Sequence, residues 1–232
     1  MKTLLAVLLT FSLGFAGNPD SLFVPKSAVG VWWPEAKSPR QAAKADVVVW
    51  FHGGMASGNC QKGFVAGEGF SKLFPDVIVV SASACKENHW ATEGMMTAVD
   101  AALDSLALRR KAPVETVSLV GISDGAIGVI VYSMRGKRQV KDRLLVSSYG
   151  PALGPAAQVA AAVTAKNGRW RFFQGGSDRL YPPHETLPWI QEFCKNAGVD
   201  CDLKYDPAGE HDWSYWQERR LDWIREAVSF KK

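Results

Sequence analysis

The stretch "VSLVGISDGAIGVIVYSM", residues 117–134, joins an apolar run typical of a buried strand to an apolar run with helical spacing. Between the two runs stands "GISDG", a G-x-S-x-G string centred on Ser123. Its flanking glycines permit a tight turn that would lift the Ser123 hydroxyl above the end of a sheet. The same string also occurs by chance, and Ser123 would then be an ordinary N-cap before a helix. The surrounding sequence has to decide between these two interpretations.

The composition is that of an ordinary globular protein. The chain has 232 residues, of which 47% are apolar and 22% charged, and this length fits one α/β domain with a sizeable core. The net charge is +4, but the basic residues are scattered, and their densest groups, at residues 109–111, 135–143 and 231–232, are not interleaved with aromatic residues. We therefore expect a solvated basic surface and no nucleic-acid partner.

The N-terminus has the pattern of a secretory signal peptide. A positive start at residues 1–2 precedes an apolar run at 4–13 and a small-x-small cleavage site at 14–16. We predict a signal peptide over residues 1–16, a single mature domain over 17–232, and a secreted or periplasmic location. The apolar run is short for a bilayer span and no other segment approaches its length, so no integral membrane segment is expected after cleavage.

The four cysteines agree with export, because an even number in an exported chain suggests two disulfides. Three pairings are possible. We favour Cys60 with Cys85, since each follows the carboxyl end of a predicted strand, and Cys194 with Cys201, which flank a short turn. The chain has no C-x-x-C motif and no His, Asp or Glu spacing typical of a ligand set, so we expect neither a metal nor a cofactor.

Buried strands alternate with helices along most of the chain, which predicts a mainly parallel sheet with helices on both faces. Residues 21–45 contain three prolines and are expected to form a short edge strand and loops. The predicted strands cover residues 46–54, 76–84, 115–123, 142–151, 169–178 and 201–207. The predicted helices cover residues 91–110, 125–136, 154–168, 184–198 and 213–230, and residues 95, 99, 102, 103 and 106 form one apolar stripe.

The loops that follow these strands carry chemically active side chains. In such sheets, ligands bind outside the carboxyl ends of the strands. In chain order these loops hold "HGGM" at residues 52–55, Ser123, Asp178 in "GGSD", and His211 in "GEHDW". A glycine loop, a serine, an acid and a histidine in this order resemble the α/β-hydrolase superfamily, over nearly the whole mature chain.

Within that superfamily, "GISDGA" and "GEHDWSYW" are similar to secreted feruloyl and acetylxylan esterases and to polyhydroxyalkanoate-depolymerase-like esterases. The resemblance implies an α/β-hydrolase fold and a Ser-Asp-His triad. A serine hydroxyl is a weak nucleophile and needs such a base within hydrogen-bonding reach.

We expect Ser123 to be the nucleophile, Asp178 the acid and His211 the base. Asp202 and Asp206 are weaker alternatives for the acid, because the first begins a strand and the second precedes a proline in a turn. The other three histidines have less suitable places. His52 belongs to the glycine loop and would support it, whereas His89 and His184 lie in other loops, where they are either surface residues or substrate contacts.

The oxyanion formed during catalysis needs hydrogen-bond donors. We expect these to be the backbone N–H of Asp124 and that of Gly54 or Met55, with the dipole of the helix after Ser123 adding to them. Asp124 itself is unusual directly after a nucleophile. We expect its side chain to point away from the oxyanion and to bond a neighbouring loop.

Between "SSYGP" and "RWRFF" the chain has room for a single Ala-rich helix, so no cap domain is expected. An open site suits small esters or the accessible esters of polymers. Trp90, Tyr149 and Tyr181, with Trp32 and Trp33, lie in or near loops and could line a groove that accepts an aromatic or sugar ring. With nine tryptophans in the chain, packing is the alternative for most of these rings.

The function that follows is an exported serine hydrolase that cleaves carboxylic esters through an acyl-enzyme, acting on small-molecule or polymer substrates. Two alternatives remain. A serine peptidase or thioesterase of the same superfamily would use the same triad, because the acyl-transfer chemistry is shared. A non-catalytic binding protein on this fold is disfavoured, because all three triad residues are present. The sequence leaves acyl and alcohol specificity and the oligomeric state open.

Overall fold

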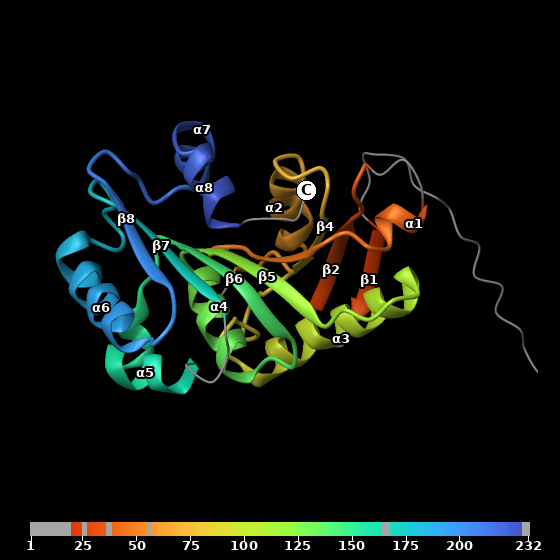
Figure 1. The fold of residues 1–232 in the computed structure, drawn as a ribbon, viewed down its shortest axis with the longest axis horizontal. Helices are drawn as coiled ribbons and strands as arrows, with labels where there is room; N and C mark the ends of the chain where they lie inside the picture. Colours follow the sequence, from red (N-terminus) through yellow and green to blue (C-terminus); the bar gives the residue numbers. More distant parts are fainter. Residues whose placement is uncertain (1–19, 25–26, 36–38, 55–56, 164–167, 229–232) are drawn as a thin grey trace, which may run out of the picture.

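The computed structural model describes residues 20–24, 27–35, 39–54, 57–163 and 168–228 (Figure 1). The predicted signal peptide, residues 1–16, and the oxyanion candidate Met55 lie outside the described residues.

Eight strands form one sheet in the order β1-β2-β4-β3-β5-β6-β7-β8. Strand β2 runs antiparallel to both of its neighbours, and the other adjacent strands pair in parallel, which confirms the mainly parallel sheet. The strands are β1 (Asp20–Val24), β2 (Ser27–Trp32), β3 (Val47–Phe51), β4 (Ile78–Ala82), β5 (Thr116–Ile122), β6 (Gln139–Val146), β7 (Arg169–Gly175) and β8 (Cys201–Asp206).

Helices cover the sheet on both sides. Figure 1 shows α2, α7 and α8 on one face and α3, α4, α5 and α6 on the other. The helices are α1 (Pro39–Ala42), α2 (Lys62–Ser71), α3 (Glu93–Arg110), α4 (Asp124–Arg135), α5 (Ala156–Val163), α6 (Pro183–Asn196), α7 (Trp213–Arg219) and α8 (Leu221–Ala227), with a 3-10 turn η1 (Gly150–Leu153). Between β6 and β7 the described chain holds only η1 and α5, and no cap domain is evident there.

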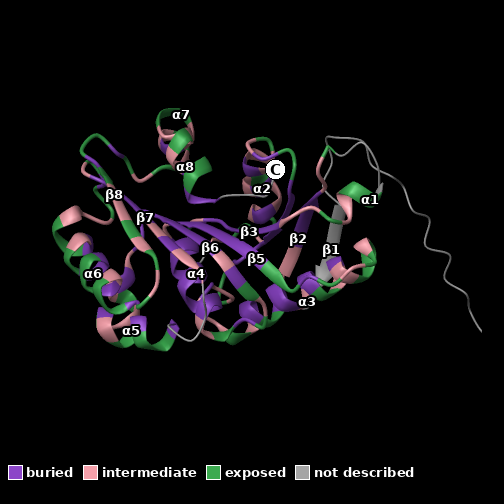
Figure 2. Ribbon diagram, viewed as in Figure 1, coloured by how far each residue is buried: buried purple, intermediate pink, exposed green. Residues whose placement is uncertain are grey.

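Two hydrophobic cores result, one on each face of the sheet. The larger core packs side chains of α3, α4, α5 and α6 against the sheet, and the smaller packs α2, α7 and α8 against the other face. Every residue of β3 and β4 is buried, as expected for strands covered on both faces (Figure 2). The predicted apolar stripe of α3 is also buried, with Met95 and Leu106 both at 0% exposure.

The structure differs from the sequence expectation at the N-terminal edge of the sheet. Two strands form there instead of one, and β1 pairs with β2 from Asp20 opposite Val31 to Val24 opposite Ser27. Both strands stop before a proline in the sequence, Pro25 or Pro34, because proline cannot donate to a ladder.

Helix α2 was not predicted, because three glycines in ten residues lower its helix propensity. The glycines serve packing instead. A Cβ on Gly63 would lie 2.6 Å from the Ala82 carbonyl oxygen, and one on Gly67 would collide with the Trp32 ring. The helix therefore lies closer to β2 and β4 than larger residues would permit.

The single terminal helix predicted over residues 213–230 is wrong. The chain turns at Arg220, with φ −136° and ψ 34°, and separates α7 from α8. Trp216 and Ile224, one from each helix, are fully buried in the smaller core. The break lets both short helices place an apolar side against the sheet.

Both favoured disulfides form, Cys60–Cys85 and Cys194–Cys201. The first connects the segment before α2 to the segment after β4, and the second connects α6 to β8. The first bridge therefore lies after the carboxyl end of β4, at the edge of the sheet that carries the candidate site, and the second lies at the amino end of β8.

Candidate active site

Ser123 stands at the sharp turn between β5 and α4. Its backbone has φ 56° and ψ −123°, a conformation that costs a non-glycine residue free energy and that occurs mostly at functional sites. The flanking glycines allow this turn to form. A Cβ on Gly121 would collide with the Gly125 carbonyl, and a Cβ on Gly125 would collide with the Phe51 carbonyl of β3. The strand-turn-helix predicted from "GISDG" is therefore present and tightly packed.

A continuous chain of hydrogen bonds links three strand ends. His211 Nε2 lies 2.8 Å from Ser123 Oγ. His211 Nδ1 lies 3.0 Å and 2.9 Å from the two carboxylate oxygens of Asp178. Nδ1–H donates to Asp178, so Nε2 is free to accept the Ser123 hydroxyl proton. The three residues come from the loops after β5, β7 and β8, and the structure brings them together as the sequence order suggests.

The Asp178 carboxylate is held ionised by its hydrogen bonds. Burial by itself would raise its pKa, since the residue is 3% exposed. The hydrogen bonds from His211 and from the backbone N–H of Tyr181 outweigh burial, so the pKa of Asp178 lies below its ordinary value. The backbone N–H of Leu180 also donates to Asp178 Oδ1, at 3.0 Å. The acid is therefore charged and fixed before any substrate arrives.

The loops that carry Asp178 and His211 are bound to one another through backbone hydrogen bonds. Gly176 N–H donates to the Asp206 carbonyl oxygen at 2.8 Å, and Ser177 N–H donates to the Gly209 carbonyl oxygen at 2.9 Å. A Cβ on Gly175 would collide with the Gly209 carbonyl. This close approach fixes the spacing between the acid and the histidine.

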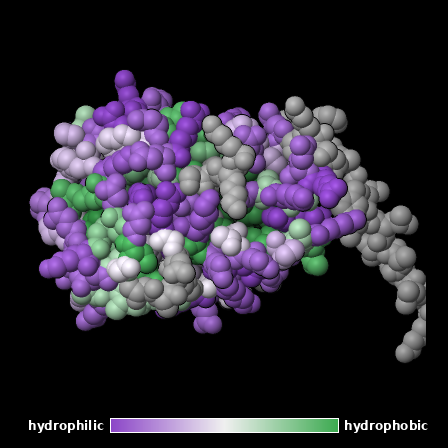
Figure 3. Space-filling view, viewed as in Figure 1, coloured by the Kyte–Doolittle hydropathy of each residue, from purple (hydrophilic) through white to green (hydrophobic). Residues whose placement is uncertain are grey.

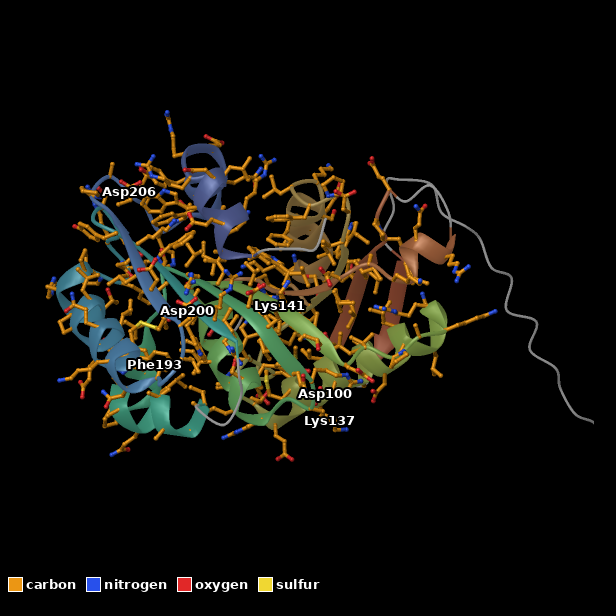
Figure 4. All side chains as sticks on the ribbon, in the orientation of Figure 1. Asp100, Lys137, Lys141, Phe193, Asp200 and Asp206 are labelled. Carbon is orange, nitrogen blue, oxygen red and sulfur yellow. A yellow bond between two sulfur atoms is a disulfide. The ribbon has the colours of Figure 1, made fainter. Side chains whose placement is uncertain are left out.

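Asp206 supports the histidine loop from the end of β8, where Figure 4 labels it. Its Oδ2 accepts a hydrogen bond from Tyr215 Oη at 2.7 Å and forms an ion pair with Arg220 Nε at 2.7 Å. Burial would raise its pKa, but the bonds from Tyr215 and Arg220 lower it. Neither alternative acid takes part in the hydrogen-bond chain: Asp206 braces the loop, and Asp202 is exposed on β8.

The glycine loop after β3 lies beside Ser123. A Cβ on Gly53 would lie 3.2 Å from the Ser123 Cβ, and Gly54 has φ 91°, a conformation that favours glycine. His52 Nδ1–H donates to the Gly53 carbonyl oxygen at 2.9 Å, and its Nε2 accepts from Ala84 N–H at 3.0 Å. His52 thus braces this loop, as predicted.

The low basicity and the hydrogen bonds of His52 make it unsuitable as the base for Ser123. Burial, together with the nearby charge of Lys62, lowers its pKa to about 4, although its bond to Gly53 opposes that change. Both ring nitrogens are already occupied by backbone partners. His52 is therefore a neutral structural residue at neutral pH.

Trp90 has a different place from the one expected for a substrate-binding ring. It is fully buried, and its Nε1–H donates to the His52 carbonyl oxygen at 2.8 Å. A ring with no exposed surface cannot contact a substrate. Trp90 instead supports the loop that carries Gly54. Trp32 is likewise buried, at 8% exposure, in the smaller core, and Trp33 is partly buried against the larger core.

Asp124 does not bond a neighbouring loop as expected. It is the first residue of α4 and only 3% exposed, and its Oδ2 has no hydrogen-bond partner among the described residues. Burial raises its pKa to about 6, and the nearby charges of His89 and Lys62 oppose this rise. The close approach of Gly125 to the Phe51 carbonyl holds this end of α4 against β3, so Asp124 is buried at the helix start.

The remaining histidines lie outside the hydrogen-bond chain. His184 has a side chain that is 79% exposed, 3.7 Å from Glu185 Oε1 on α6. His89 is half-buried after β4, where its charge reaches Asp124. Neither has the contacts that a base for Ser123 would need.

A stacked pair of tyrosines flanks His211. The ring centroids of Tyr149 and Tyr181 are 5.1 Å apart at an interplanar angle of 27°, and Tyr181 meets the His211 imidazole edge-on at 4.9 Å. Tyr149 Oη donates to Glu185 Oε2 at 3.0 Å. Both rings are half-exposed, so they can present an aromatic surface beside the histidine.

Elsewhere the exposed large apolar residues of the described chain are scattered over different elements. Figure 3 shows a mostly hydrophilic face with smaller apolar areas. The residues concerned are Val65, Leu108, Leu180 and Tyr205.

Two residues beside the site were missed by sequence reasoning. Lys62, the first residue of α2, places its Nζ against Gly54, at the position that a Cβ there would occupy. The supporting role of Asp206 was also missed. The spacing of Tyr215 and Arg220 after Asp206 carries no recognised signal, and Lys62 lies on a helix that was not predicted, so only the tertiary structure reveals either role.

No helix among the described residues is both long and apolar enough to cross a membrane. Within that same part of the chain, no group of three or more His, Cys, Asp or Glu side chains is arranged to hold a metal ion.

Comparisons with known proteins identify the fold. No family model matches the chain, and no curated protein matches it either. Among solved structures, a thermostable esterase is 13% identical with a TM-score of 0.63, over 90% of this chain and 62% of that one. Esterase PE8 is 19% identical with a TM-score of 0.60, over 88% of this chain and all of that one. An acylaminoacyl peptidase is 14% identical with a TM-score of 0.65, over 90% of this chain and 40% of that one.

The chain thus spans less than two thirds of the first esterase and of the peptidase, and the whole length of the second esterase. At these identities the likeness establishes the fold alone. The chain has the α/β-hydrolase fold, as the order of its motifs predicted.

Proposed function

We propose that this protein is an exported serine hydrolase that cleaves carboxylic esters through an acyl-enzyme. One observation carries the proposal: the hydrogen-bond chain from Asp178 through His211 to Ser123, with the serine on a strained turn at the carboxyl ends of the strands. The esterases among the similar structures support the same class of reaction.

In acylation, Ser123 Oγ attacks the ester carbonyl carbon while its proton passes to His211 Nε2, 2.8 Å away. The imidazolium that forms is stabilised by the ionised Asp178. When the tetrahedral intermediate collapses, His211 returns the proton to the departing alcohol oxygen. The acyl group then remains on Ser123.

Deacylation repeats these steps with water as the nucleophile. His211 takes a proton from the water as it attacks the acyl carbon, and then returns a proton to Ser123 Oγ as the carboxylic acid leaves. In both halves the carbonyl oxygen becomes an oxyanion. We propose the backbone N–H groups of Asp124 and Gly54 or Met55 as its donors, each worth about 3–4 kcal/mol in the transition state.

The proposed substrates are small esters or accessible esters on polymers. The absence of a cap domain in the described chain between β6 and β7 supports an open site. Because His211 must reach the leaving oxygen, the alcohol part of the substrate would lie beside Tyr181 and Tyr149, which can contact a ring. The finer resemblance to feruloyl, acetylxylan and polyhydroxyalkanoate esterases belongs to this proposal as well.

Export is proposed from the signal-peptide pattern of residues 1–16. The two disulfides are compatible with an oxidising compartment, either the periplasm or the medium.

The test is a substrate panel assayed with the wild-type protein and the Ser123→Ala variant. The panel contains nitrophenyl acetate and butyrate, a feruloyl ester, an acetylated sugar and a polyhydroxybutyrate film. We expect turnover of at least one ester by the wild type and a loss of about 10³-fold or more in the variant. Equal turnover by both proteins, or failure of an organophosphonate to label Ser123, contradicts the proposal.

The similarity to an acylaminoacyl peptidase favours a second candidate, amide hydrolysis by the same three residues. A thioesterase would use them as well. Aminoacyl anilides and acyl thioesters added to the panel distinguish these activities from ester cleavage. A protein that is labelled at Ser123 yet turns over none of the substrates would point instead to a binding protein on this fold.

A further inference from the structure

Asp124 places a buried carboxyl group beside the proposed oxyanion site, and the mechanism above gives its side chain no task. The residue follows Ser123 directly, is 3% exposed, and leaves Oδ2 without a partner. Its backbone N–H is proposed to stabilise negative charge, whereas an ionised side chain at the same residue would oppose that charge. Something nearby has to offset the carboxylate if the site is to work at neutral pH.

Lys62 is in position to do so. It begins α2 on the far side of the glycine loop, and its Nζ lies against Gly54 in the space that a Cβ would fill. The positive charge of Lys62 lowers the pKa of both Asp124 and His52. Lys62 is therefore next to one proposed oxyanion donor, Gly54, and electrostatically coupled to the residue that supplies the other.

We propose that Lys62 is a positioning residue whose ammonium group offsets the Asp124 carboxylate and so keeps the oxyanion site favourable to negative charge. The inference rests on the proposed function and deepens it. Lys62 does not touch the reacting atoms in this role, because it acts through Asp124 and the glycine loop. Loss of Lys62 would leave an uncompensated negative charge beside the developing oxyanion.

Two other titratable groups face this region from the elements packed around it. His89, in the loop after β4, opposes the rise in the pKa of Asp124 more strongly than Lys62 does, but the described atoms within 4 Å of a Cβ on Gly54 belong to Lys62. His52, at the end of β3, is neutral because burial lowers its pKa to about 4. Lys62 is therefore the charged group that connects Asp124 with the proposed donor loop.

The direction of the pH dependence follows from the carboxyl group. Burial raises the pKa of Asp124 to about 6, against the opposing charges of His89 and Lys62. Well above pH 6 the side chain is ionised and needs the lysine, whereas well below pH 6 it is protonated and does not. Removing Lys62 raises the pKa of Asp124 further, since a favourable charge is lost. The ratio of variant to wild-type kcat should therefore fall as the pH rises.

The activity test compares Lys62→Gln with the wild type on the best ester of the panel, from pH 5 to pH 9. We expect kcat to fall about tenfold at pH 8 and less than about twofold at pH 5. In the Asp124→Asn background the same lysine substitution should cost less than about twofold at every pH.

Lys72→Gln is the matched control, because it removes the same charge from the other end of α2. Its side chain is 72% exposed and pairs only with Glu68, at 2.8 Å. We expect this variant to keep wild-type kcat throughout. An effect of Lys62→Gln that does not change with pH, or that persists in the Asp124→Asn background, overturns the proposal.

A second measurement does not depend on catalysis. In the inactive Ser123→Ala protein, the carboxyl carbon of Asp124 can be titrated by ¹³C NMR with and without Lys62→Gln. An upward shift in the pKa of Asp124 is expected when Lys62 is removed, and an unchanged pKa overturns the coupling. If no ester is turned over at all, the proposed function fails. The titration still measures, separately, the electrostatic coupling between Lys62 and Asp124.

Discussion

Two aspartates lie on opposite sides of Ser123, equally buried at 3% exposure, and their pKa values move in opposite directions. We call the region of Asp178 and His211 the acid side, and the region of Asp124, Gly54 and Lys62 the oxyanion side. On the acid side, Asp178 accepts hydrogen bonds from His211 and from the backbone N–H groups of Leu180 and Tyr181. On the oxyanion side, Asp124 Oδ2 accepts none. Burial raises the pKa of both carboxyl groups, and at Asp178 the hydrogen bonds reverse that effect.

The difference originates in the backbone around each residue. Asp178 lies in a loop whose next residues curl back and point their N–H groups at its carboxylate. Asp124 begins a helix that is held against β3 by Gly125, and no described donor reaches its Oδ2. The ionised form of Asp178 is therefore stabilised by direct hydrogen bonds, whereas the ionised form of Asp124 is favoured by the nearby charges of His89 and Lys62.

The largest expected effect comes from breaking the acid side. Asp178→Asn should lower kcat by about 10⁴-fold with little change in KM, because an amide no longer fixes the Nδ1–H tautomer of His211. Steady-state kinetics on the best ester, normalised by organophosphonate titration of active sites, measures this loss.

Asp202→Asn is the control for that substitution, since Asp202 was an alternative acid and is exposed on β8. It should retain wild-type kcat. A loss of less than tenfold in Asp178→Asn, or an equal loss in Asp202→Asn, would show that Asp178 does not orient the histidine.

The two disulfides offer a second comparison of the acid side with the oxyanion side, this time through the free energy of unfolding. Cys60–Cys85 closes a segment of 25 residues that includes Lys62, and Cys194–Cys201 closes one of only 7 residues. The chain-entropy relation gives about 3.5 kcal/mol for the longer loop and about 2.4 kcal/mol for the shorter one. Denaturant unfolding of the two Cys→Ser double variants measures these losses.

The double variant at residues 60 and 85 should also lose more kcat than the one at residues 194 and 201, because the first bridge borders the oxyanion side. Equal stability and equal kcat in the two variants would show that the bridges do not distinguish the two sides.

The sequence predicts the grouping of Ser123, Asp178 and His211 well and the surroundings of Asp124 poorly, for a physical reason. Ser123, Asp178 and His211 follow buried strands, and the carboxyl ends of parallel strands meet at one edge of a sheet. The order of apolar runs along the chain is therefore enough to place their loops together. The alternation of apolar runs and turn residues likewise predicts every strand from β3 to β8.

The oxyanion side depends on contacts that sequence patterns do not encode. Helix α2 is rich in glycine and has low helix propensity, so Lys62 lies on an element that was not expected. Trp90 was expected near a groove, but it is buried beneath the glycine loop. Asp124 was expected to bond a neighbouring loop, and the packing of α4 against β3 prevents it.

The smallest expected effect is a change in the free energy of unfolding with pH, measured for each of the two aspartates. An acid whose pKa is raised in the folded state costs stability as it ionises. Asp124, raised from 3.8 to about 6, should therefore destabilise the protein progressively between about pH 4 and pH 6 and fully above that. Asp124→Asn removes this cost. We expect it to gain roughly 1–2 kcal/mol at pH 8 relative to pH 4, equivalent to about 2–8 °C in Tm.

The gain is taken as a difference between the two pH values because a buried amide has a cost of its own, which does not depend on pH and cancels. Asp178→Asn, measured in the same way, should show the opposite sign. The lowered pKa of Asp178 contributes stability that is present above its unfolded value near 3.8 and is lost as the pH falls through its folded value. Urea unfolding of the wild type and Asp124→Asn at pH 4 and pH 8 measures the first difference. For Asp178→Asn the lower pH has to lie below 3.8, at about pH 3, because its contribution is lost only there. If both variants lose stability at pH 8, the ionised form of Asp124 is stabilised in the folded protein as that of Asp178 is. The difference in hydrogen bonding would then not explain how the two carboxyl groups behave.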